Sequence, residues 1–137
     1  MEYRASASIA APPEKVWAVL TDVAKWPEWD PFCEKIEGNL ALGNKIKAFT
    51  KLSPGRAFPV KVTELDAPKR MEWSGGMPLG LFKGVRTFQL VPSGSGTEFT
   101  LHEKFSGPML ALIGKSIPDM SEAFEKFVHG LKQRSEA

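Results

Sequence analysis

The strongest constraint on the fold is a run of short segments between positions 32 and 105 in which apolar and polar residues alternate. Alternation with a period of two residues predicts strands with one buried and one solvated face. Only short turns rich in glycine, proline, asparagine and serine separate the segments. Because such connections are too short for the crossovers of a parallel sheet, we predict an antiparallel meander. Its six strands span residues 32–38, 45–52, 58–65, 70–75, 82–91 and 97–105.

One further strand and two short helices are predicted before the meander. Residues 3–9 alternate between apolar and polar side chains, which is typical of a strand with one wet face. Two prolines and an acid begin residues 12–20, and both residue types suit the first turn of a helix. A second helix after Asp22 must be short, because Pro27 and Pro31 interrupt it.

After Pro108 the apolar residues return to helical spacing. Pro118 predicts a kink or break near residues 115–117. The apolar stripe that follows consists of Met120, Phe124, Phe127, Val128 and Leu131. This helix is the only large apolar element that can cover the sheet, and a curved sheet around one helix leaves space between them. We therefore predict one α+β domain over residues 1–137: a seven-stranded curved antiparallel sheet, order β-α-α-β6-α, wrapped around a long C-terminal helix with an internal cavity.

Charge and cysteine content argue against several classes of function. Lysine and arginine number 18 against 16 acids, a net charge of +2 with no dense basic run, so we expect no nucleic-acid partner. The single cysteine, Cys33, cannot form an internal disulfide, and neither His102 nor His129 has a partner at metal-ligand spacing. We expect no metal, no other cofactor and no catalytic triad.

The chain has neither a membrane-length apolar segment nor the pattern of a signal peptide. We therefore expect a cytoplasmic protein without stable membrane insertion, either a monomer or a weak homodimer.

Several local patterns, in this order, resemble the START-like (SRPBCC, helix-grip) superfamily, and the polyketide cyclase/dehydrase branch in particular. Residues 11–17 (APPEKVW) resemble the start of the first helix of that family, and residues 22–31, which contain WPEWDP, resemble its "D…WP.W.P" segment. Residues 84–88 (GVRTF), 96–99 (GTEF) and 102–107 (HEKFSG) resemble its last hairpin and the step into the final helix. The resemblance implies a curved sheet that grips the long helix over an internal pocket. Function in this superfamily is diverse, so the resemblance does not imply one chemistry.

Strand parity places two charged residues on the apolar side of the last hairpin. Glu103 shares a face with apolar neighbours in residues 97–105, and Arg86 shares a face with Phe88 in residues 82–91. A hairpin that pairs position 90 with position 99 sets Arg86 opposite Glu103. The pair is interpreted either as a polar anchor for a ligand inside an apolar pocket or as an ion pair that only satisfies itself.

The remaining pocket candidates are aromatic and aliphatic residues of the last strands, the final helix and the proline-broken segment. The full predicted ligand-binding set is Trp26, Trp29, Trp73, Arg86, Phe88, Phe99, Leu101, Glu103, Phe105, Met109, Ile113, Met120 and Phe124. For the tryptophans, plain core packing is the alternative. The apolar, glycine-rich stretch 75–82 is interpreted as an ordinary hairpin, or else as a lid or a membrane-touching tip.

Three functions fit these features. The first is binding or carrying an apolar or amphipathic small molecule, such as a lipid, a quinone or an aromatic polyketide. The second is a polyketide cyclase/aromatase-like enzyme that uses Arg86 and Glu103 to polarise its substrate. The third, which the resemblance implies because some START-like proteins work in this way, is an accessory or assembly protein that acts through protein contacts. The first is favoured because the predicted fold forms a pocket and no catalytic set accompanies it.

Overall fold

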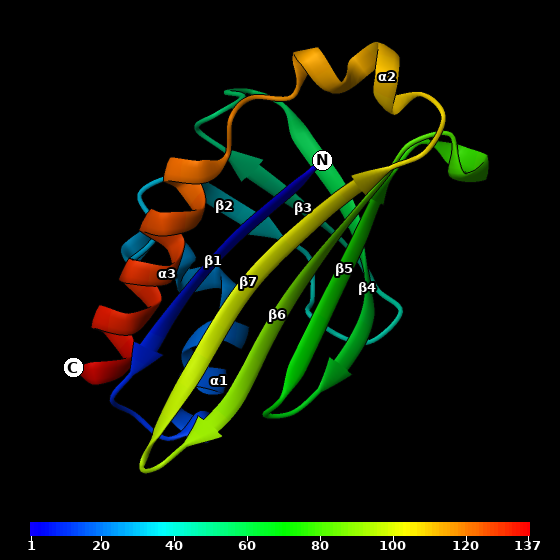
Figure 1. Ribbon diagram of the computed structural model, residues 1–137. Helices are drawn as coiled ribbons and strands as arrows, with labels where there is room; N and C mark the ends of the chain where they lie inside the picture. Colours follow the sequence, from blue (N-terminus) through cyan, green and yellow to red (C-terminus); the bar gives the residue numbers. More distant parts are fainter.

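The computed structural model, which describes residues 1–137, contains one curved antiparallel sheet of seven strands (Figure 1). The strands are β1 (Glu2–Ile9), β2 (Cys33–Glu37), β3 (Lys45–Thr50), β4 (Ala57–Asp66), β5 (Arg70–Gly76), β6 (Lys83–Ser93) and β7 (Gly96–Ser106). Their order across the sheet is β1-β7-β6-β5-β4-β3-β2. The predicted meander is therefore confirmed, and β1 extends it at one edge by pairing with β7.

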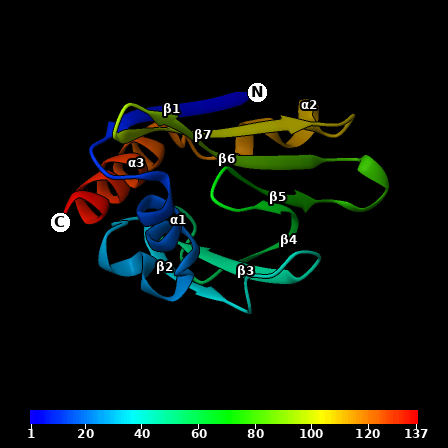
Figure 2. The same ribbon diagram turned by 90° about the horizontal axis from the view of Figure 1, so that it is seen from below.

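The helices also follow the predicted order. They are α1 (Pro13–Thr21), the 3-10 helix η1 (Val23–Glu28), α2 (Leu110–Ile113), the 3-10 helix η3 (Gly114–Ser116) and α3 (Ser121–Glu136), with one further turn, η2 (Pro78–Gly80), between β5 and β6. The predicted break before Pro118 separates η3 from α3. Seen from below, α1 and α3 lie together at the same side of the curved sheet (Figure 2). The α+β helix-grip architecture predicted from the sequence is thus confirmed.

The strand boundaries differ from the prediction by one or two residues, and the end of β6 is one of the two-residue differences. Residues 92–96 were expected to form a loop, but β6 continues through Pro92 to Ser93, with Pro92 opposite Thr97. The reason lies in the pairing. The N–H of Leu90 points toward β5 and donates to the carbonyl of Lys69, the residue just before that strand. The nitrogen of Pro92, two residues later, points to the same side, but β5 has no residue left to pair with it there. A proline lacks the N–H that would be needed only if β5 continued there.

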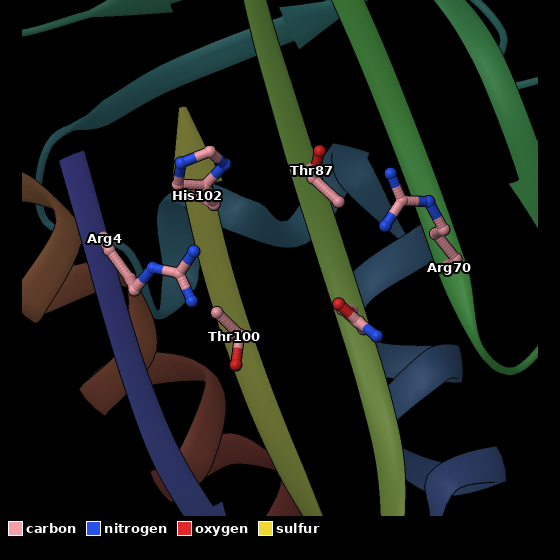
Figure 3. Close-up of a pocket in the computed structure, with 6 residues that line it drawn as sticks. Arg4, Arg70, Thr87, Thr100 and His102 are labelled. Atoms are coloured by element: carbon pink, nitrogen blue, oxygen red, sulfur yellow. The ribbon is translucent and has the colours of Figure 1, made fainter. Parts of the chain in front are cut away.

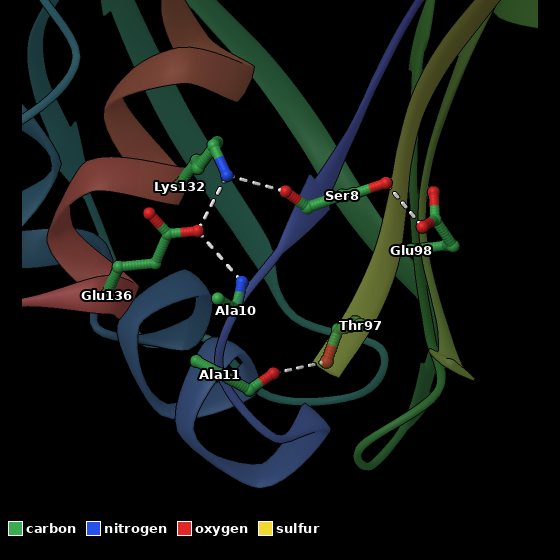
Figure 4. A network of polar contacts seen from close by, with 7 residues as sticks. All are labelled: Ser8, Ala10, Ala11, Thr97, Glu98, Lys132 and Glu136. Atoms are coloured by element: carbon green, nitrogen blue, oxygen red, sulfur yellow. Dashed lines mark hydrogen bonds and ion pairs between the residues drawn. The ribbon is translucent and has the colours of Figure 1, made fainter. Parts of the chain in front are cut away.

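A set of polar contacts fastens the C-terminal helix to the first strand (Figure 4). Nζ of Lys132 donates to the Ser8 carbonyl at 2.7 Å and to Glu136 at 2.6 Å. The Ala10 N–H donates to the same Glu136 carboxylate at 2.8 Å. These bonds hold the end of α3 against the end of β1.

The interior between α3, η1 and the sheet is filled by aromatic side chains. Trp26 lies at their centre, with its ring centroid 5.2 Å from that of Trp73, 5.0 Å from that of Phe127 and 6.0 Å from that of Phe88. Its indole N–H donates to the Leu20 carbonyl at 2.9 Å, which satisfies its one polar atom. Each such buried aromatic ring stabilises the fold by about 2 kcal/mol or more.

Burial of the inner face of the sheet changes along the strands. On β6, Phe88 and Leu90 are buried, whereas Gly84 and Arg86 on the same face are half-buried. On β4, Val62 is buried while Phe58 and Val60 are half-buried. The helices α1, η1 and α3 therefore cover one end of the inner face. The other end, nearer η2 and α2 (Figure 1), is more accessible on β4 and β6, although Glu103 and Phe105 on β7 stay buried there.

Candidate functional site

Arg86 and Glu103 lie at the accessible end of the inner face, directly opposite each other on β6 and β7. Nε of Arg86 donates to Oε1 of Glu103 at 2.6 Å. The Glu103 side chain is 10% exposed and that of Arg86 26%, so water reaches the arginine more than the acid. The guanidinium also lies over the ring of Phe124, 5.1 Å from its centroid. The register predicted for this hairpin is confirmed.

The pair has hydrogen-bonding capacity that the protein does not use. Arg86 makes one side-chain hydrogen bond, through Nε, and its two Nη groups donate to no protein atom. Oε2 of Glu103 accepts no protein hydrogen bond. A guanidinium can donate five hydrogen bonds and a carboxylate can accept about four. Both groups can therefore bind a further polar partner without breaking their own contact.

Trp73 adds a third unpaired group. Trp73 on β5 pairs directly with Arg86 on β6, on the side of β6 away from Glu103, and is only 3% exposed. Its Nε1 is buried and has no hydrogen-bond partner. Buried N–H groups are almost always paired in native proteins. The indole N–H of Trp73, the residue paired with Arg86, is thus a donor whose hydrogen nothing in the chain receives.

Asp30 is a second acid near Arg86. It follows η1, is 8% exposed, and its Oδ1 accepts the Phe32 N–H at 3.1 Å. Burial raises the pKa of Asp30 above its usual 3.8, opposed by the Phe32 hydrogen bond and by the charges of Arg86 and Lys51. The sequence prediction did not include Asp30; the only signal was its place between Trp29 and Pro31.

Apolar side chains surround the pair. The ring of Tyr3 lies 6.3 Å from that of Phe105 and 5.9 Å from that of Phe124, and Phe82 stacks on Phe105 at 5.7 Å. Tyr3 and Phe82 were missed because each begins a predicted strand, where parity gives little information. The predicted residues Met109, Ile113 and Met120 are half-buried in the connection from β7 to α3.

Most of the other predicted residues belong to the core. Trp26, Trp29, Trp73, Phe88, Phe99 and Leu101 are buried in one continuous cluster. These side chains contact one another, so between α3 and the sheet they fill space. Their participation in ligand binding stays a prediction.

A polar depression of about 190 Å³ lies on the outer face of the sheet (Figure 3). It spans four strands and is lined by Arg4, Arg70, Thr87, Gln89, Thr100 and His102. His102 lies on this outer face, and its Nε2 is 3.3 Å from the Glu2 carboxylate. Arg70 is paired with Glu64 at 2.8 Å.

A second depression, of about 450 Å³, lies between η1 and the end of α3. Its lining residues are Pro27, Glu28, Trp29, Pro31, Gly130, Gln133, Arg134 and Ala137. Arg134 donates to Glu28 across it at 2.7 Å. Neither Arg86 nor Glu103 lines either depression, so both depressions lie apart from the inner-face pair.

The hairpin at residues 75–82 exposes apolar side chains. Leu79 is 97% exposed and has a positive φ of 60°, and Met77 and Leu81 are exposed beside it. The N–H of Met109 donates to the Leu81 carbonyl at 2.8 Å, which ties this hairpin to the connection that leads into α2. A role as a lid or membrane-touching tip stays a prediction.

Two further features bear on cofactors and membranes. No three or more His, Cys, Asp or Glu side chains gather in a way that could hold a metal ion. None of the helices has the length and apolar character needed to span a bilayer.

Comparison with known proteins identifies the family. The model of the family described as "Polyketide cyclase / dehydrase and lipid transport" matches residues 1–136. The chain belongs to this family. The resemblance found in the local motifs is therefore confirmed over nearly the whole chain, while a comparison with curated proteins finds no match.

Solved structures similar to this family member share its fold. A START superfamily protein from Mycobacterium smegmatis has a TM-score of 0.70 at 18% identity, with 98% of this chain and 97% of that one covered. A protein from Thermus thermophilus has a TM-score of 0.72 at 24% identity, covering 98% and 97%. The Aha1 dimer from Colwellia psychrerythraea has a TM-score of 0.73 at 22% identity, covering 99% and 96%. At these identities the likeness shows the fold alone.

Proposed function

We propose that this protein binds an apolar or amphipathic small molecule against the accessible end of its inner face, with Arg86 and Glu103 as the polar contact. One observation carries the proposal. An ion pair lies among apolar side chains with unused donors and an unused acceptor, beside an unpaired indole N–H. The family description, which includes lipid transport, supports the same class of ligand.

The physical reason is the cost of leaving such groups unpaired. Charged and polar groups removed from water stabilise a structure only when partners satisfy them. A ligand whose polar end reaches Arg86 would supply those partners, and its apolar body would cover half-buried side chains such as Phe58 and Val60. Burying about 100 Å² of apolar surface contributes roughly 2.5 kcal/mol.

A second candidate is a cyclase-type enzyme that acts in the same place. The observation that favours it is Asp30, a buried acid whose pKa is raised and which lies within the field of Arg86. A raised pKa makes a buried acid a better proton donor to a substrate oxygen, and a nearby guanidinium can polarise the same group. This candidate requires turnover, which binding alone does not.

Native mass spectrometry of freshly purified protein, followed by solvent extraction, tests the binding proposal. A stoichiometric apolar molecule that dissociates on extraction is the expected result. The double variant Arg86→Met/Glu103→Leu should lose that molecule while remaining folded, because replacing a whole ion pair by apolar residues is often neutral for stability.

The matched control is Arg70→Met/Glu64→Leu. That pair has the same Nε-to-Oε1 contact, at 2.8 Å, but both of its side chains are 38% exposed. It should retain the ligand. Loss of the ligand in both double variants, or protein that never carries an apolar molecule and binds none added, contradicts the proposal.

A further inference from the structure

Trp73, Arg86 and Glu103 form one row across three neighbouring strands. Trp73 pairs with Arg86 across β5 and β6, and Arg86 pairs with Glu103 across β6 and β7. In an antiparallel sheet, directly opposed residues point to the same face. All three therefore project from the inner face in a fixed sequence of donor, cation and anion.

The charges in this row cancel. Glu103 neutralises the guanidinium of Arg86 through a 2.6 Å contact. The next buried ionisable group, Asp30, is an acid as well. Lys51 and Arg56, between β3 and β4, are exposed, so water and salt screen their charges. The inner polar groups thus offer no net positive charge to an anion.

Their unused hydrogen-bonding groups suit an uncharged oxygen. Nε1 of Trp73 and the Nη groups of Arg86 are donors without protein acceptors, and Oε2 of Glu103 is an acceptor without a donor. A carbonyl oxygen can accept from the donors, and a hydroxyl can also donate to Oε2. A carboxylate would accept from the same donors but would meet Glu103 and Asp30 as neighbouring acids.

We propose that this row selects a ligand with an uncharged polar end, a ketone or hydroxyl oxygen received by Trp73 and Arg86, over a carboxylate on the same apolar body. The inference rests on the proposed function, because it names the chemical class of the ligand at the same site. The reason for the selection is desolvation. A carboxylate loses strong hydration on entering the site and gains no net opposite charge there.

Isothermal titration calorimetry with pairs of probes tests the selection. One pair is 2-acetylnaphthalene and 2-naphthoate, and a second pair is 1-decanol and decanoate, so that each pair shares its apolar body. Near neutral pH, if a pair binds, its ketone or alcohol should bind at least about ten-fold more tightly than its carboxylate. The uncharged probe gains a hydrogen bond, whereas the charge of the carboxylate is not compensated in the site.

Two variants separate charge from hydrogen bonding. Glu103→Gln keeps the shape but leaves Arg86 as a net cation, so carboxylate affinity should rise about ten-fold or more. Trp73→Phe removes the indole N–H together with part of the aromatic surface, and should reduce the preference for the uncharged probe by about five-fold or more. The controls are Glu64→Gln, in the exposed outer pair, and Trp17→Phe, on α1; both should leave each affinity unchanged.

The outcomes separate the ligand selection from the proposed function. Carboxylates that bind the unaltered protein as tightly as their uncharged partners overturn the selection and leave the proposed function standing. The selection is also overturned, and the proposed function left standing, if Glu103→Gln does not raise the affinity for the carboxylates. If neither pair binds the unaltered protein, the proposed function itself fails, and the selection fails with it.

Discussion

Gly130 on α3 packs directly against Trp29, at the end of the segment that carries Asp30. A Cβ atom at position 130 would overlap the carbonyl oxygen of Trp29, which belongs to the backbone and cannot rotate away. The absence of a side chain at this one helical position lets α3 approach η1 closely. That approach is what buries Phe127 against Trp26 and Trp29, at 5.0 Å from each ring.

Gly130→Ala should therefore destabilise the fold by about 3 kcal/mol or more, because overpacking against backbone forces the helix outward. Urea unfolding followed by tryptophan fluorescence measures the loss. The control is Gly114→Ala, where the nearest atom to a new Cβ is Leu110 Cδ1 at 3.5 Å and the backbone is right-handed helical. That change should be neutral or stabilise the protein by up to about 1 kcal/mol. Equal effects of the two substitutions would show that α3 and η1 are not in close contact.

Glu103→Ala should reduce the free energy of unfolding by about 2–3 kcal/mol. The change leaves Arg86 without its partner, and the expected loss is below that of a fully buried pair because 26% of the arginine side chain is exposed. Glu64→Ala, in the 38%-exposed pair with Arg70, should cost no more than about 1 kcal/mol. Denaturant titration of both variants gives the comparison. A Glu103→Ala loss as small as the control would place the inner pair in solvent.

The stability effect of Asp30→Asn should depend on pH with a defined sign. The folded-state pKa of Asp30 is raised, so its protonated form contributes stability that is complete below its unfolded value near 3.8 and lost as pH rises through the folded value. Asparagine does not titrate. The variant should therefore gain stability relative to the unaltered protein on going from pH 3 to pH 7, as measured by urea unfolding at several pH values.

Asp119→Asn provides the opposite case. The backbone N–H of Ser121, and then its hydroxyl, hold the pKa of Asp119 below its usual value. Its contribution is present above the unfolded pKa and lost as pH falls through the folded one, so this variant should lose relative stability over the same range. Parallel pH profiles for the two variants would contradict the raised pKa of Asp30.

Cys33 should be nearly inert in the folded protein. Burial, followed by the charges of Asp30 and Glu34, raises the pKa of its thiol to about 12. Because the thiolate is the reactive form, Ellman's reagent at pH 8 should react with the native protein at least about a hundred-fold more slowly than with protein in denaturant. Comparable rates in the two conditions would show that the start of β2 opens readily.

The sequence determined the sheet and the central pair. Period-two alternation identified every strand, since a strand that buries one face must alternate its side chains. The same alternation placed Arg86 and Glu103 on one face, and the short turn near Gly94 favoured the register that sets them opposite each other. A slip of two residues would have kept both on that face, and the structure confirms the predicted register. Where this local reasoning failed, as at Pro92, the pairing of a neighbouring strand decided the outcome.

Only the tertiary structure decided what surrounds that pair. The position of Asp30 in the field of Arg86, the unpaired Trp73 N–H and the stacking of Phe82 on Phe105 join elements that are remote in sequence. The same holds for the division of the inner face into a filled end and an accessible end, which depends on where α1, η1 and α3 pack. Periodicity reports which face of a strand is buried. It does not report what covers that face, because the covering side chains come from other parts of the chain.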